Sequence, residues 1–122
     1  MAPAVFGLGL IEAIKAEDIL RNEDILDLDK DTISGRANFI NDVPSNNKML
    51  GKFGWKANRA TLLHHVAGAA SQDMGLTSSF FPEQNCTVIQ KECSNQISGG
   101  SPEISEKPVS YTHLTLPTKR IV

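Results

Sequence analysis

The stretch over residues 51–75, GKFGWKANRATLLHHVAGAASQDMG, constrains the fold more than any other part of the sequence. It contains the only tryptophan, Trp55, and a helical pattern with a signal at each end. Asn58 is a favourable N-cap residue, and Gly75 is a favourable residue just beyond a helix C-terminus. We therefore predict a helix over residues 59–74, with an apolar stripe formed by Leu63, Val66, Ala70 and Met74.

Two of the three histidines stand on this predicted helix. The stripe places His64 at its edge and His65 on the opposite, polar side. The run AGAAS has only small side chains, so the helix is thin around Gly68, with little side-chain bulk. We expect another helix or the plane of a cofactor to approach closely there.

Composition limits the chain to one small domain. It has 122 residues, of which 40% are hydrophobic, and nine glycines and six prolines interrupt it. Short apolar stripes predict helices from about residue 10 and over residues 16–26, and an extended piece over residues 35–42. No apolar run approaches the roughly 18 residues that a membrane span needs. The net charge of −2, with scattered basic residues, argues against a nucleic-acid partner.

An acidic segment, DLDKDTISGR, follows the second predicted helix. Asp27, Asp29 and Asp31 alternate before a turn, a pattern that can supply oxygen ligands to Ca²⁺. A full EF-hand loop would carry glycine and an acid where Thr32 and Asn38 stand. The segment is therefore either a variant calcium site or a solvated acidic turn with local hydrogen bonds.

The only two cysteines, Cys86 and Cys93, bracket a short loop. Their spacing is neither CxxC nor a zinc pattern. They form either a disulfide, if the compartment is oxidising, or two free thiols.

The last fourteen residues are treated separately. Residues 109–118, VSYTHLTLPT, resemble the in-frame translation of a transposon-end adapter used in sequencing libraries, and KRIV continues it. We therefore expect residues 109–122 not to be native and exclude them from functional argument. The opening MAPAVFGLGL lacks a signal-peptide pattern, so we also expect a longer reading frame before Met1.

Several phrases occur in an order that resembles one known family. They are GLGLIEAI, DKDTISGRAN, GKFGWKAN, VAGAASQDMGLTSSFFP, the cysteine pair and GGSPEIS. The resemblance extends, in this order, over nearly all of residues 1–108. Together they resemble the di-haem c-type cytochromes called thiol oxidoreductases or di-haem oxidoreductases. No CxxCH motif occurs in the chain. The resemblance therefore implies that residues 1–108 are an internal fragment between two haem-binding parts.

The resemblance implies a mainly α fold with long irregular loops, like part of a cytochrome c that lacks its haem-attachment motifs. It implies a periplasmic or exported protein that carries haem c and transfers electrons in peroxidase-like or thiol redox reactions. Its partner would be a redox protein or a small electron donor or acceptor. Whether the chain alone is an enzyme stays open, because no catalytic set is visible in it.

Two residues are candidates for contact with haem. Trp55 could lie at a haem edge, although a core position is the more frequent place for a lone tryptophan. Met74 could be an axial ligand, although its place on the apolar stripe favours packing. His64 and His65 are interpreted as polar surface residues. The alternative function is a small binding module without redox activity, stabilised by calcium at the acidic loop.

Overall fold

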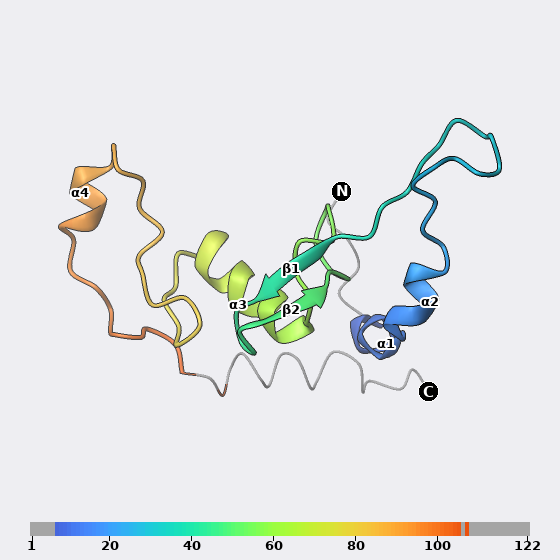
Figure 1. The fold of residues 1–122 in the computed structure, drawn as a ribbon. Helices are drawn as coiled ribbons and strands as arrows, with labels where there is room; N and C mark the ends of the chain where they lie inside the picture. The colour runs from blue at the N-terminus through green and yellow to red at the C-terminus, as the bar shows by residue number, and fades with distance from the viewer. Residues whose placement is uncertain (1–6, 106, 108–122) are drawn as a thin grey trace.

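The computed structural model describes residues 7–105 and 107. Its central part is an antiparallel hairpin packed beside the longest helix, with an arm of loops and short helices on each side (Figure 1). The elements in chain order are α1 (Leu8–Ala13), α2 (Ala16–Leu20), β1 (Phe39–Asp42), β2 (Asn47–Leu50), α3 (Leu62–Gln72) and α4 (Lys91–Ser94). The tail over residues 109–122 lies outside the described residues.

The prediction of a mainly α fold is wrong. The four helices of the described chain have 6, 5, 11 and 4 residues, and a two-stranded sheet stands among them. The second helix, predicted to reach residue 26, ends at Leu20. The Asn22 side chain donates a hydrogen bond to the Asp18 carbonyl there, and Asp24 then pairs with Gly35 in an isolated bridge. Local hydrogen bonds of this kind compete with helix continuation and produce a mixed, loop-rich fold.

The hairpin confirms the extended piece that the sequence predicts before residue 42. Phe39 pairs with Leu50 and Asp42 with Asn47, so a turn over residues 43–46 joins β1 to β2. The turn is closed by the backbone N–H of Asn46, which donates to the Asp42 carbonyl over 2.7 Å. Asn46 adopts a φ of 53°, which asparagine tolerates better than most residues.

Helix α3 begins later than the sequence predicts. Thr61, rather than Asn58, is its N-cap, and the Thr61 hydroxyl accepts a hydrogen bond from the backbone N–H of His64 over 3.1 Å. The C-terminal end of the helix lies close to where the sequence predicts it. Gly75 has a φ of 71°, and the N–H of the next residue, Leu76, donates back to the Ala70 carbonyl.

The packed core is small and lies between the hairpin, residues 53–60 and α3. Its buried apolar residues are Leu50, Phe53, Ala60, Leu62, Ala67 and Ala70. The buried face of α3 is rotated from the predicted stripe, so His64 is only 4% exposed and Met74 is 68% exposed. The rotation follows from buried polar contacts between α3 and β1, which no apolar periodicity encodes.

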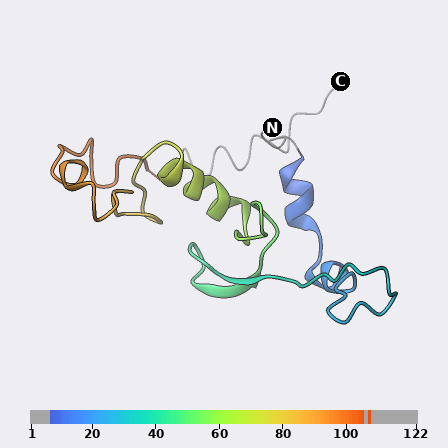
Figure 2. The ribbon, with the colours of Figure 1, turned by 90° about the horizontal axis from the view of Figure 1, so that it is seen from above.

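Apolar side chains are exposed on both arms. They include Leu26, Leu28 and Ile33 on one arm and Val88, Ile89 and Ile97 on the other. Seen from above, the two arms extend away from the hairpin and α3 in opposite directions (Figure 2). No helix in the described part is long and apolar enough to cross a bilayer.

Candidate functional site

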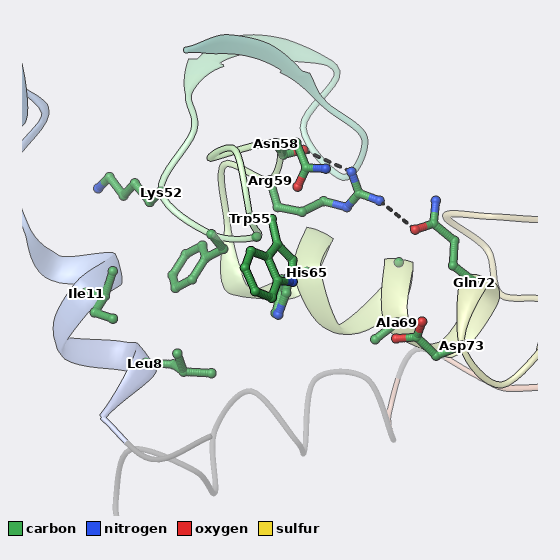
Figure 3. Close-up of a pocket in the computed structure, with 13 residues that line it drawn as sticks. Leu8, Ile11, Lys52, Trp55, Asn58, Arg59, His65, Ala69, Gln72 and Asp73 are labelled. Carbon is green, nitrogen blue, oxygen red and sulfur yellow. Dashed lines mark hydrogen bonds between the residues drawn. The ribbon is translucent and has the colours of Figure 1, made fainter. Parts of the chain in front are cut away.

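A cleft of about 630 Å³ lies between α1, the loop over residues 52–59 and α3. Figure 3 shows that its composition changes from one end to the other. Leu8 and Ile11 of α1 lie at one end, close to Lys52 (Figure 3), and Phe53 also lines the cleft. The Lys52 ammonium donates to the backbone carbonyls of Glu12 and Ile14 over 2.9 and 2.6 Å. Arg59 and Gln72 belong to the opposite, polar end. The cleft is therefore suited to a ligand that is apolar at one end and charged at the other.

Trp55 stands at the mouth of this cleft, in front of His65 (Figure 3). The loop that carries it is closed by backbone hydrogen bonds in both directions between Phe53 and Arg59. Gly54 makes the loop possible, because it adopts a φ of 82° and a side chain there would collide with Asn58. Trp55 is 92% exposed, so the expectation of a core tryptophan is wrong. Its indole is free to cover a ligand in the cleft.

His65 supplies an imidazole to the middle of the cleft. Its ring stacks on Phe53, with the ring centroids 6.0 Å apart and the planes at 25°. Within residues 7–105, its ring nitrogens have no protein hydrogen-bond partner. Burial, and then the positive charge of Arg59, lower the pKa of His65 below its ordinary value of 6.5. At neutral pH the ring is therefore uncharged.

Arg59 is the cation at the polar end. Its guanidinium donates to the Asn58 carbonyl over 2.9 Å and to the Gln72 side-chain oxygen over 3.1 Å. Both acceptors are neutral, and no carboxylate of the described chain lies within ion-pair distance. The guanidinium rests against Gly68, where a Cβ atom would stand 2.9 Å from the Arg59 Nε. The thin region predicted around Gly68 thus admits a side chain of the same protein.

A buried polar network lies on the other side of α3 and ties it to β1. His64 Nδ1 lies 3.1 Å from Asp42 Oδ1, and the two residues are 4% and 1% exposed. The same carboxylate accepts from the Thr61 hydroxyl over 2.9 Å and from the Ser45 hydroxyl over 2.7 Å. Because a carboxylate only accepts, Nδ1 of His64 carries the proton. The prediction of His64 as a surface residue is therefore wrong.

Burial and hydrogen bonds together set the ionisation of this network. Burial by itself would raise the pKa of Asp42, but the hydrogen bonds from Ser45 and Thr61 outweigh it and lower that pKa below 3.8. Burial, and then the charge of Arg59, lower the pKa of His64 below 6.5, which the Asp42 carboxylate offsets only in part. The pair at neutral pH is a carboxylate with a neutral imidazole.

We expect the chain to lose stability when the pH falls from 7.5 to 5.5. The unfolded chain binds more protons than the folded chain once the pH passes below 6.5, because the pKa values of His64 and His65 are lowered by folding. Urea unfolding at the two pH values measures the loss. A His64→Gln, His65→Gln double variant should show a weaker dependence. A chain that is equally stable at both pH values would contradict the assignment.

The acidic loop brings some of the predicted carboxylates together. One oxygen each from Asp24, Asp27 and Asp29 lies within 4.8 Å of the others, whereas Asp31 is not in this group. The carboxylates also accept backbone N–H groups of the loop itself: Asp24 from Leu28, and Asp27 from Thr32. Sequence reasoning missed Asp24, which stands outside the alternating pattern. The contacts are those of an acidic turn with local hydrogen bonds.

The cysteines are joined in a disulfide, with their Cα atoms 5.9 Å apart. The bond closes a loop that carries α4, on the arm farthest from α1 (Figure 1). Met74 lies beyond the C-terminal end of α3, exposed and not among the residues that line the cleft. Of the two haem-contact candidates from the sequence, the structure thus brings only Trp55 to the cleft.

Sequence reasoning missed Arg59 and Asp42 as site residues. Arg59 stands inside the region predicted to be helical, and its role depends on the Phe53–Arg59 bridge, which no periodicity reveals. Asp42 ends a strand and contacts residues 19 and 22 positions away along the chain. A buried acid at a strand end has no sequence signal of its own.

A comparison with protein families gives one match. The family described as "Di-haem oxidoreductase, putative peroxidase" matches residues 1–95. No curated protein and no solved structure matches the chain.

Proposed function

Because the chain belongs to the di-haem oxidoreductase family, we propose that it forms the part of a haem c electron-transfer oxidoreductase that packs beside a haem. The haem cofactor and the redox class follow from the family. In this proposal the surface that faces the haem is the cleft between α1, the Trp55 loop and α3.

The observation that carries the proposal is the graded lining of the cleft. A haem has an apolar macrocycle and carboxylates at one edge. The side chains of Leu8, Ile11 and Phe53 match the former, and the Arg59 charge, which has no acidic partner in the described chain, matches the latter. The other lining cation, Lys52, donates to the backbone carbonyls of Glu12 and Ile14. The cleft volume of about 630 Å³ is adequate for a group of that size. The residues therefore fit the group that the family requires.

Haem would supply electron transfer through its iron when bound. The residues of this chain have other roles in the proposal. Trp55 covers the mouth of the cleft, and the neutral His65 lines the cleft without adding charge. The sequence has no CxxCH motif. In the proposal the thioether bonds of haem c are therefore made by residues outside this sequence, and the chain is a segment between two haem-binding parts.

The exposed apolar residues on both arms support a role within a longer protein. Further parts of a protein would cover such side chains, which include Leu28, 79% exposed, and Ile97, 99% exposed. The disulfide supports a periplasmic or exported location, because disulfides persist in oxidising compartments. Electrons would pass to a redox partner protein or a small acceptor, in a peroxidase-like or thiol reaction.

The direct test is covalent haem in the product of the uninterrupted reading frame. We expect that product, expressed with a cytochrome c maturation system, to retain haem on a denaturing gel and to show a haem c pyridine haemochrome spectrum. A reading frame that encodes no CxxCH on either side, or a product that releases all its haem on denaturation, would contradict the haem c proposal.

A calcium-stabilised binding module without redox activity is the alternative. It is favoured by one observation, the proximity of the Asp24, Asp27 and Asp29 carboxylates. Under this alternative, about 1 mM Ca²⁺ should raise the melting temperature of the 122-residue chain more than equal Mg²⁺ does. Under the haem proposal we expect no difference between the two ions, because the loop carboxylates already accept local N–H groups.

A further inference from the structure

We propose that Arg59 anchors a carboxylate of the ligand in the cleft, so that the ligand lies with its charged edge toward α3 and its apolar edge toward α1. The inference rests on the proposed function, in which the ligand is haem and the carboxylate is one of its propionates. The inference adds the orientation of the haem in the cleft and names Arg59 as the partner of its carboxylate. Neither follows from family membership.

The first argument is the unbalanced charge of Arg59. A guanidinium has five N–H donors in a planar fork that matches a carboxylate. The side-chain hydrogen bonds of Arg59 within residues 7–105 go to two neutral oxygens, on Asn58 and Gln72. Donors therefore remain for a ligand, and the positive charge has no counter-ion within ion-pair distance in that part of the chain.

The second argument is that this charge is held in place. The Phe53–Arg59 bridge fixes the backbone at Arg59. Gln72, one turn beyond Gly68 on α3, holds the guanidinium from the other side. Gly68 leaves the space in which the guanidinium rests. A cation held by backbone and side-chain contacts on two elements binds an anion with less loss of side-chain entropy than a free surface arginine.

The third argument is the field in the cleft. The charge of Arg59 contributes to the lowered pKa of both His65 and His64, so its potential extends along α3. Two further charged residues line the cleft. Lys52 is at the α1 end, where its ammonium is held by the Glu12 and Ile14 carbonyls. The Asp73 carboxylate lines the same end as Arg59 and opposes the binding of an anion. Because Asp73 is exposed at the end of α3, solvent screens its charge. The resulting preference is for an anionic group next to Arg59.

The test uses Trp55 as the reporter, because it is the only tryptophan and stands at the cleft mouth. The 122-residue chain is titrated with iron protoporphyrin IX and with its dimethyl ester, which lacks the charged carboxylates, in the same nonionic detergent. We expect the acid to quench Trp55 emission with an affinity about tenfold higher than that of the ester, the effect of one charge-assisted hydrogen-bond pair.

Three variants assign the preference to Arg59. Arg59→Gln should lower the affinity for the acid about tenfold and leave that for the ester unchanged. Arg59→Lys should recover part of the loss. Gly68→Ala keeps every charge but displaces the guanidinium, so it should also reduce the preference for the acid. Asp73→Asn is the matched control, with equal or tighter binding of the acid. Circular dichroism checks that each variant folds.

The outcomes separate this inference from the proposed function. Equal affinity for acid and ester, or an Arg59→Gln variant that keeps the preference, would overturn the Arg59 anchor and leave the haem-facing cleft in place. A chain in which neither compound quenches Trp55 would overturn both. Binding that follows Arg59, combined with a reading frame that lacks CxxCH, would support the anchor and contradict the haem c proposal.

Discussion

Replacing Asp42 with alanine should lower the free energy of unfolding by roughly 2–3 kcal/mol, the cost of leaving the buried His64 imidazole and the half-buried Thr61 hydroxyl without their acceptor. The Asp42 carboxylate accepts from Ser45, Thr61 and His64, and it is 1% exposed. Its removal leaves the His64 imidazole, which is 4% exposed, where water reaches it poorly, whereas the exposed Ser45 can bond to water. Because these residues join the β1–β2 turn to the first turn of α3, the loss affects the contact between the two elements.

Urea unfolding at pH 7.5, followed by circular dichroism, measures the change. Asp42→Asn keeps one acceptor oxygen and should lose less stability than Asp42→Ala. Asp73→Ala removes an exposed carboxylate and should change the free energy of unfolding by less than about 0.5 kcal/mol. A loss for Asp42→Ala no larger than that for Asp73→Ala would show that the network does not join β1 to α3.

Leu62→Ala is the second variant with a large expected effect, a loss of about 3 kcal/mol. Leu62 is fully buried at the start of α3, and its N–H donates to the Glu12 carboxylate of α1 over 2.9 Å. Truncation leaves a cavity where α3 meets α1 and the hairpin. In a chain whose core is this small, such a loss is a large share of the total stability.

Met74→Ala is the control for Leu62→Ala. The sequence pattern places Met74 on the packed stripe of the helix, whereas the structure leaves it 68% exposed. We therefore expect a change of less than about 0.5 kcal/mol in the free energy of unfolding. If Met74→Ala destabilised the chain as much as Leu62→Ala, the predicted stripe would be right and the structure wrong about the face that α3 buries.

Leu62 and Met74 show which features of α3 can be predicted from the sequence and which cannot. A helix in this region and its end near Gly75 follow from local signals and are confirmed. The start at Thr61 and the buried face do not follow, because both depend on Asp42, which is nineteen positions before Thr61. Apolar periodicity predicts which face a helix buries only when the buried groups are apolar. Here His64 and Ser71 are buried beside Leu62 and Ala67.

The residues of the candidate site are predicted less well than helix α3. Trp55 is singled out by its uniqueness, but its exposure depends on the loop that Gly54 and the Phe53–Arg59 bridge create. Arg59 has no sequence signal that separates it from any other surface arginine. The family, in contrast, is recognised from phrases in the sequence, and the match over residues 1–95 confirms it. The family is recognised from phrases that follow one another along the sequence. The contacts across the cleft join residues that are distant in the sequence, so only the structure reveals them.

The most direct test of the central claim is hydroxyl-radical footprinting of Trp55. The product of the uninterrupted reading frame is compared in its haem-loaded and haem-free forms, with the oxidation of Phe39, which is half-exposed on β1 and does not line the cleft, as the internal reference. Because Trp55 is 92% exposed at the cleft mouth, a haem in the cleft should cover it and slow its oxidation several-fold relative to Phe39. An equal rate in both forms would contradict a haem-facing cleft.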